Sequence, residues 1–199
     1  IEMAMNSPYI STPLRMLDVC PASDGACAMI FAEEDRAKKI TDTPAWVKGV
    51  SAVAEGVGYV DRDWAVPIAL TAAAKKAYKQ AGITNPRKEL DVAEIYEAFS
   101  YQEMIWSEGL MFCGENEGWK LVEEGVTKMN GELPINPSGG VLSTNTIGAT
   151  AMMRMCEAAL QVMGKADKRQ VPGVKTALAH GWGGGIQFHT VMILGKEPN

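Results

Sequence analysis

The segment 136–154 constrains the fold of this chain more than any other. Gly139 and Gly140 precede a short apolar run that we expect to be a strand, and a polar turn follows it. Gly148 then opens a helix that we expect over 150–163, because apolar residues recur there at helical spacing. A strand–turn–helix unit directs backbone N–H groups and a positive helix end toward whatever lies over the turn. The residues alone leave a binding site and a tight packing turn as open alternatives.

Strand-like and helix-like patterns alternate along the rest of the chain. A helix is expected between Asp63 as its cap and Gly82 as its stop, with Pro67 in its first turn. Further strands are expected over 16–20, 26–32, 46–53, 90–96, 176–180 and 186–194, further helices over 33–39 and 99–110, and a glycine turn over 181–185. This alternation predicts an α/β layered domain with a buried sheet.

Composition excludes several classes of protein. The 199 residues are 47% hydrophobic and 22% charged, with a net charge of −5, which is typical of a globular protein that does not bind nucleic acid as its main partner. We expect no membrane span, since no apolar run is long enough, and no signal peptide. The four cysteines show no CxxC pair and no histidine at metal-ligand spacing. We therefore expect free thiols, no metal site and a reducing, cytoplasmic location.

Four motifs occur in a specific order: 23–30, 91–100, 139–154 and 180–185. Together they resemble the C-terminal half of the thiolase superfamily, and most closely its sterol-carrier-protein-x-type and lipid-transfer-like branch. The sequence Tyr-Glu-Ala-Phe-Ser at 96–100 resembles the family's Asn-Glu-Ala-Phe or His-Asp-Cys-Phe motif. The segment 139–154 resembles its Gly-Gly…Gly-His-Pro…Gly-Ala motif, and 180–185 its final Cys-x-Gly-Gly or His-Asn-x-Gly motif.

The resemblance implies a layered α-β-α-β-α fold with mixed five-stranded sheets, of which this chain carries mainly the C-terminal half. Residues 1–45 would end the N-terminal domain, and residues 46–199 would form the C-terminal domain. The chain lacks an initiator Met, and we expect it to be a fragment or one half of a larger unit. The family's nucleophilic cysteine would then lie upstream of Ile1.

The chain departs from the family at the residues that move protons. Asn145 occupies the place of the family's histidine; its amide can donate a hydrogen bond to an oxyanion but cannot take a proton near neutral pH. The positions of the family's second cysteine hold Gly181 and Ala98. Another residue must therefore supply the acid or base.

Three side chains are candidates for that role: His180, Tyr96 and Glu97. Each also has a structural interpretation, because the histidine could be a satisfied core residue, the tyrosine could cap the core, and the carboxylate could fix the loop. Asn145 could likewise be a helix cap. From the resemblance we expect the backbone around four glycines to contact coenzyme A: Gly139, Gly140, Gly148 and Gly183.

The resemblance implies a thiolase-like acyltransferase that cleaves a β-ketoacyl-CoA, or runs the reverse Claisen condensation. One alternative is a retro-aldolase that acts on acyl-CoA esters such as those of steroid side chains, and another is a noncatalytic lipid-binding subunit. No cofactor is expected to be permanently bound, and coenzyme A would be a substrate. The expected partners are an N-terminal half and either a second copy or a small subunit with a zinc ribbon and an OB fold.

Overall fold

A mixed four-stranded sheet forms the centre of the computed structural model, which describes residues 1–56, 60 and 62–198. Its strands are β3 (Trp46–Ala54), β4 (Val92–Glu94), β5 (Thr176–Gly183) and β6 (Phe188–Gly195). They lie in the order β3-β6-β5-β4. The β4–β5 pair is parallel, and the other two pairs are antiparallel. The sheet is therefore a hairpin of β5 and β6 with one further strand on each side.

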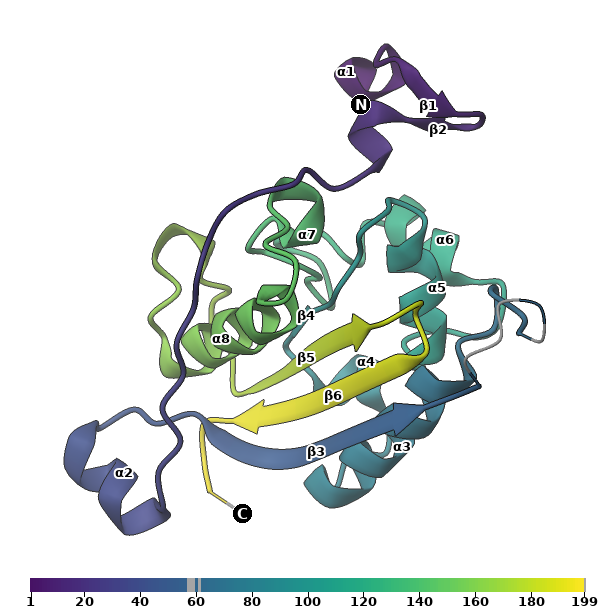
Figure 1. Ribbon diagram of the computed structural model, residues 1–199. Coiled ribbons are helices and arrows are strands. Elements are labelled where there is room, and N and C mark those ends of the chain that lie inside the picture. Colours follow the sequence, from purple (N-terminus) through teal and green to yellow (C-terminus); the bar gives the residue numbers. More distant parts are fainter. Residues whose placement is uncertain (57–59, 61, 199) are drawn as a thin grey trace.

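Two 14-residue helices cover opposite faces of this sheet. Helix α3 (Ile68–Ala81) packs on β3 and β6, whereas α8 (Thr150–Met163) packs mainly on β5 and β4 (Figure 1). Side chains alternate between the two cores as the pleat requires. Along β5, Leu178 joins the core on the α3 face, while Ala177 and Ala179 join the core on the α8 face.

Short helices complete the domain on both faces. On the α3 face lie α4 (Pro86–Glu89), α5 (Gln102–Gly109) and α6 (Gly118–Glu123), and near the start of α8 lies α7 (Gly140–Ser143) (Figure 1). A 3₁₀ turn, η2 (Asp167–Arg169), follows α8. Among the described residues, no helix combines the length and apolar character that crossing a membrane requires.

The first 45 residues lie largely outside the sheet and the helices that cover its two faces. Helix α1 (Glu2–Met5), strands β1 (Tyr9–Ser11) and β2 (Leu14–Arg15) and the 3₁₀ turn η1 (Met16–Asp18) form a small unit that projects from the domain (Figure 1). Segment 19–33 then runs along α7 and α8, and α2 (Glu34–Ile40) leads into β3. The division of the chain at residue 45 stays a prediction.

Several expected elements are confirmed. Helix α8 spans 150–163, as its periodicity predicts, and both α3 and α8 end at a left-handed glycine, Gly82 and Gly164. The strands near 46–53 and 186–194 and the helix near 33–39 are present, with small shifts at their ends. Asp63 does not cap α3, which begins at Ile68.

Three of the expected strands were wrong. Segment 26–32 forms no strand, because none of the described strands pairs with it, and Ile30 and Phe31 are exposed. Segment 16–20 is mainly the turn η1. The run after Gly139 is helix α7, since Gly139 and Gly140 both have positive φ (95° and 64°), which an extended strand does not allow.

The glycine motif at 180–185 also differs from the expected turn. Residues 181–183 belong to β5, and the hairpin turn covers 184–187. The described sheet has four strands rather than five, with one isolated parallel bridge between Ala93 and Ile135 beyond β4. The layered α/β class with a mixed sheet is nevertheless confirmed.

Candidate active site

Tyr96 and Asn145 meet where β4 ends and α8 begins. The Tyr96 hydroxyl donates to Oδ1 of Asn145 at 3.3 Å, and the Thr150 hydroxyl donates to the same oxygen at 2.7 Å. All three residues are buried, with 8% or less of their surface exposed. The amide is therefore oriented, with its oxygen fixed by two hydroxyls and its nitrogen directed away from them. Asn145 does not cap α8, because no side chain caps that helix end.

The amide nitrogen of Asn145 is directed toward Cys20. The Nδ2–Sγ distance is 3.1 Å, so one amide hydrogen is donated to the sulfur. The backbone secures the same segment to the site: Cys20 N–H donates to the carbonyl of Ala98, and Ser23 N–H donates to the carbonyl of Asn145. Cys20 was not a candidate from the sequence. The sequence gives one indication of a role in the site: Cys20 lies three residues before Ser23, where the first of the four motifs begins.

Tyr96 is a neutral phenol at neutral pH. Desolvation by burial raises the pKa of its hydroxyl above the ordinary value of 10, and this effect exceeds the lowering by the hydrogen bond with Thr150. Its ring packs against Trp182 with centroids 4.7 Å apart. The hydroxyl can therefore donate a hydrogen bond or a proton, whereas the phenolate needed for a base is scarce.

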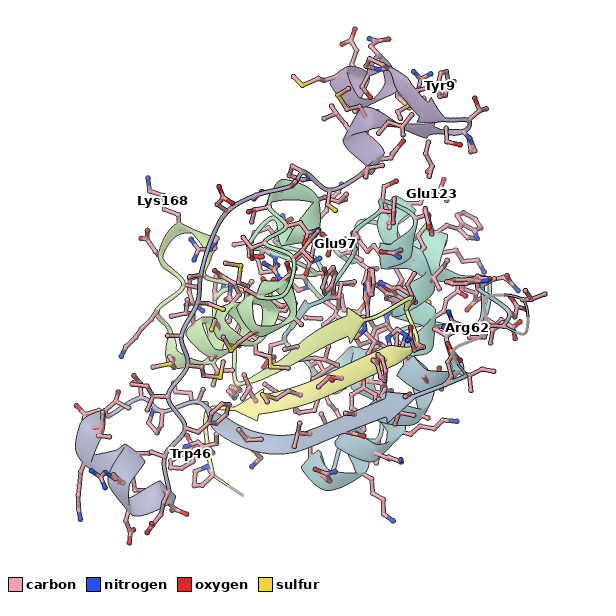
Figure 2. All side chains as sticks on the ribbon, in the orientation of Figure 1. Tyr9, Trp46, Arg62, Glu97, Glu123 and Lys168 are labelled. Atoms are coloured by element: carbon pink, nitrogen blue, oxygen red, sulfur yellow. The ribbon has the colours of Figure 1, made fainter. Side chains whose placement is uncertain are left out.

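Glu97 anchors the loop that carries α7 (Figure 2). Its carboxylate accepts the backbone N–H groups of Val141 (2.8 Å) and Leu142 (3.2 Å) and the side-chain amide of Asn136. Burial raises the pKa of Glu97 to about 7, despite these donors. Both carboxylate oxygens are engaged, so Glu97 orients the loop between β4 and α8.

Gly140 is required for this contact. A Cβ atom at that position would collide with the Glu97 carboxylate, and the residue has positive φ. Gly139 and Gly148 also have positive φ, a backbone conformation that favours glycine at both positions. Gly183 lies in β5 with open space where a Cβ would be. Contact of these four glycines with coenzyme A stays a prediction.

A buried ion pair lies under the same junction and was not identified from the sequence. Arg154 of α8 donates to the carboxylate of Glu94 and to the Ser138 hydroxyl, both at 2.7 Å. Glu94 is fully buried and Arg154 is 2% exposed. The pair fixes α8 to the end of β4, and thereby Asn145 relative to Tyr96.

His180 lies on the opposite face of the sheet from this cluster. It is fully buried on the α3 face, stacked on His189 with ring centroids 5.3 Å apart and beside Trp106 of α5. Its contact with Tyr96 is through the backbone N–H, 3.4 Å from His180 Nδ1. The structure therefore brings together Tyr96, Asn145 and Glu97 of the four candidates, and keeps the His180 ring away from the Tyr96 hydroxyl.

Both histidines are held neutral. Burial lowers the pKa of His180 well below its usual 6.5, and the neighbouring His189 lowers it further. Burial lowers the pKa of His189 to about 4, and the positive charge of Arg62 acts in the same direction. Arg62 is itself paired with Glu55 at 3.1 Å, and both line a small cavity beside His189 together with Asp63.

The free energy of unfolding should therefore depend on the two histidines between pH 6.5 and 4. The unfolded chain binds their protons below pH 6.5 and the folded chain does not, so stability falls as pH falls, by about 1.4 kcal/mol per pH unit for each histidine. Glu94 and Glu97 act in the opposite direction, because their folded pKa values are raised.

The measurement is urea unfolding from pH 7.5 to 4.5 of the wild type and the His180→Asn/His189→Asn variant. The carboxylates are common to both proteins, so their contribution cancels in the difference. The wild type should lose stability relative to the variant as pH falls. Parallel stability curves would show that the two imidazoles do not stay neutral in the folded protein.

Comparisons with known proteins agree with this architecture. A family model described as "Thiolase C-terminal domain-like" matches residues 52–196. An acetyl-CoA acetyltransferase of Methanothermobacter thermautotrophicus is 37% identical over 186 residues, covering 92% of this chain and 48% of that protein. Sterol carrier protein 2 of Bos taurus is 35% identical, covering 98% of this chain and 37% of that protein. The chain thus spans about half, or less, of the length of these relatives.

Solved structures show the same fold. The "Ltp2-ChsH2(DUF35) aldolase" superimposes with a TM-score of 0.84 at 25% identity, over 98% of this chain and 50% of that chain. A monomeric SCP2-thiolase-like protein from Mycobacterium smegmatis gives a TM-score of 0.56 at 20% identity. The resemblance to the C-terminal half of the thiolase superfamily, in its sterol-carrier and lipid-transfer branch, is confirmed. Since the family model covers most of its length, the chain belongs to the thiolase C-terminal domain-like family.

Proposed function

We propose that this chain supplies the C-terminal half of an enzyme that breaks a carbon–carbon bond in an acyl-CoA ester. The observation that carries the proposal is the hydrogen-bonded chain of Thr150, Asn145 and Tyr96 at the start of α8. Thiolysis and retro-aldol cleavage both release a thioester enolate, whose oxygen needs hydrogen-bond donors. Asn145 has a second amide hydrogen besides the one donated to Cys20, and this hydrogen would bind the enolate oxygen. The Tyr96 hydroxyl, which donates to Asn145 Oδ1 in the structure, would turn from that oxygen to the substrate when it gives up its proton.

The better-supported reaction is retro-aldol cleavage of a β-hydroxyacyl-CoA. The β-hydroxyl loses its proton, the Cα–Cβ bond breaks, and its electron pair moves into the enolate held by Asn145. Tyr96 then donates its proton to Cα, and the hydroxyl proton, passed on by the base, restores the phenol. The products are an aldehyde or ketone and a shortened acyl-CoA. This path needs no acyl-enzyme, which suits an amide at position 145 that cannot accept a proton. We assign the base to the preceding half of the enzyme.

Thiolysis of a β-ketoacyl-CoA is the second candidate. Its support is the 37% identity to an acetyl-CoA acetyltransferase. In this reaction a nucleophilic cysteine in the preceding half would attack the keto carbon, and the enolate would again form at Asn145. Coenzyme A would be a substrate in both reactions, with no cofactor permanently bound.

The assembly is also a proposal. One solved relative is described by its name as an aldolase of Ltp2 with ChsH2 (DUF35). We propose that the enzyme containing this chain also has a second component, which is either a second copy or a small subunit with a zinc ribbon and an OB fold. We further propose that it works in the cytoplasm.

Product analysis with the complete enzyme tests the reaction. A β-hydroxyacyl-CoA with a tertiary hydroxyl is supplied in D₂O without free coenzyme A, and a β-ketoacyl-CoA is supplied separately with and without it. Retro-aldol cleavage should give a ketone and a shortened acyl-CoA with one deuterium at Cα. If the enzyme cleaves the β-ketoacyl-CoA but not the β-hydroxyacyl-CoA, and does so only when free coenzyme A is present, the reaction is thiolysis. Tight binding of both esters without cleavage would assign a lipid-binding role.

A further inference from the structure

The two buried histidines form a hydrogen-bonded chain with one direction. His189 Nε2 lies 3.1 Å from the carbonyl oxygen of Ile186, which can only accept, so this nitrogen carries the hydrogen. Nδ1 of the neutral His189 must then accept, and it lies 3.0 Å from Nε2 of His180. The second hydrogen is therefore on His180 Nε2, which leaves His180 Nδ1 as an acceptor for the Tyr96 N–H.

The hydrogen-bonded chain of the two histidines ends at the backbone N–H of Tyr96, a residue that no strand of the described sheet pairs with. The parallel pairing of β4 with β5 ends at Glu94 and Ala179, two residues before Tyr96. Side chains bind the backbone of Tyr96 in place of a strand: His180 accepts its N–H, and the indoles of Trp106 and Trp182 both donate to its carbonyl oxygen at 2.8 Å. The Tyr96 backbone is thus held from the α3 face while its hydroxyl lies on the α8 face.

We propose that the His180–His189 pair is a positioning device, which fixes the backbone of Tyr96 and thereby the direction of its hydroxyl toward Asn145. The inference rests on the proposed function, in which that hydroxyl donates the proton. The pair acts in its neutral form, because a proton on His180 Nδ1 would place one N–H donor against another. Neither imidazole touches the substrate, so both act through Tyr96.

Two substitutions at one position separate positioning from packing. In His180→Asn the side-chain oxygen replaces Nδ1 as an acceptor, whereas His180→Leu has no acceptor. The matched control is Leu178→Ala, a fully buried residue on the same face of β5 whose aliphatic side chain cannot accept a hydrogen bond from the Tyr96 backbone. Leu178→Ala should lower the melting temperature, because it leaves a cavity. At temperatures where this variant is folded, its kcat should equal that of the wild type.

The complete enzyme should respond through kcat rather than KM. His180→Leu should lower kcat by about 10–100-fold with KM within about 3-fold, since a small misplacement of a catalytic group costs up to about 10²-fold. His180→Asn should recover most of that loss. The proposal is overturned if His180→Leu and His180→Asn have equal kcat. It is also overturned if neither variant has a lower kcat than Leu178→Ala, compared at the same fraction of folded protein.

Nitrogen NMR of the complete enzyme, labelled with ¹⁵N-histidine and ¹⁵N-tyrosine, gives a readout that needs no turnover. Both imidazoles should be neutral with hydrogen on Nε2, and the Tyr96 amide resonance should shift in His180→Leu and much less in His180→Asn. A charged ring, the opposite tautomer or an unmoved Tyr96 amide would overturn the positioning role. If the wild type cleaves no acyl-CoA ester, the proposed function fails. The spectra would still show whether the two histidines and the Tyr96 N–H form the hydrogen-bonded chain.

Discussion

Tyr96→Phe should lower kcat for carbon–carbon cleavage by about 10²–10⁴-fold, the range for a lost general acid or base. Phenylalanine keeps the ring contact with Trp182 and the backbone contacts with His180 and the indoles, and it removes only the hydroxyl. KM should change little, because the hydroxyl acts on the enolate rather than on the bound ester. Steady-state kinetics on the cleaved substrate measure both constants.

The matched control is Tyr101→Phe. Tyr101 lies five residues later, is partly exposed and stacks on Phe99, outside the cluster. Removal of the Tyr101 hydroxyl should leave the kcat of the enzyme unchanged. In the wild type the rate should fall at alkaline pH above 10, because burial raises the pKa of the phenol that must stay protonated. A Tyr96→Phe enzyme with wild-type kcat would remove Tyr96 from the reaction.

Asn145→Ala should lower kcat by about 10²–10³-fold, the loss expected for one oxyanion-hole donor, with a much smaller change in KM. The amide is neutral across the working pH range, so it can stabilise charge without moving a proton. Asn145→Asp should be worse than Ala, because it places a carboxylate beside the developing negative charge. The order of the two variants distinguishes a donor from a merely packed side chain.

Asn130→Ala, in an exposed loop, is the control for loss of an amide. A structure with a bound CoA ester completes the test. A silent Asn145→Ala variant, with its wild-type amide beyond hydrogen-bonding distance of the thioester oxygen, would leave Asn145 as a support for Cys20 and Thr150 and would contradict the mechanism.

The sequence predicts elements whose signal is local. Helix α8 follows from 14 residues of regular apolar spacing and Gly164, both of which are read within one window. Segment 26–32 has the composition of a strand, but a strand needs a partner, and no local pattern supplies one. The sequence predicts a strand after Gly139 and Gly140, but both glycines have positive φ and the run is helix α7. The Glu97 carboxylate, which occupies the space of a Cβ at Gly140 and binds the Val141 N–H, comes from a distant part of the chain and has no local signal.

The same limit applies to the candidate site. Motif order placed Tyr96, Asn145 and Glu97 in one region, where the structure brings them together. It did not reveal Cys20, whose contact with Asn145 is set by chain folding, or that His180 pairs with His189 on the other face. Strand parity decides that face: Tyr96 extends beyond β4 on the α8 side, while His180 shares the α3 side with Leu178.

The contact between Cys20 and the Asn145 amide also affects how the protein is made. The two residues are 125 positions apart, so during synthesis the thiol leaves the ribosome long before its amide partner exists. Closing so long a loop is slow compared with forming local helices and hairpins. The α3 side of the sheet also depends on late residues, because β5 and β6 are the last strands in the chain. The contact between Cys20 and Asn145 in the candidate site can therefore form only after the start of α8 has been synthesised.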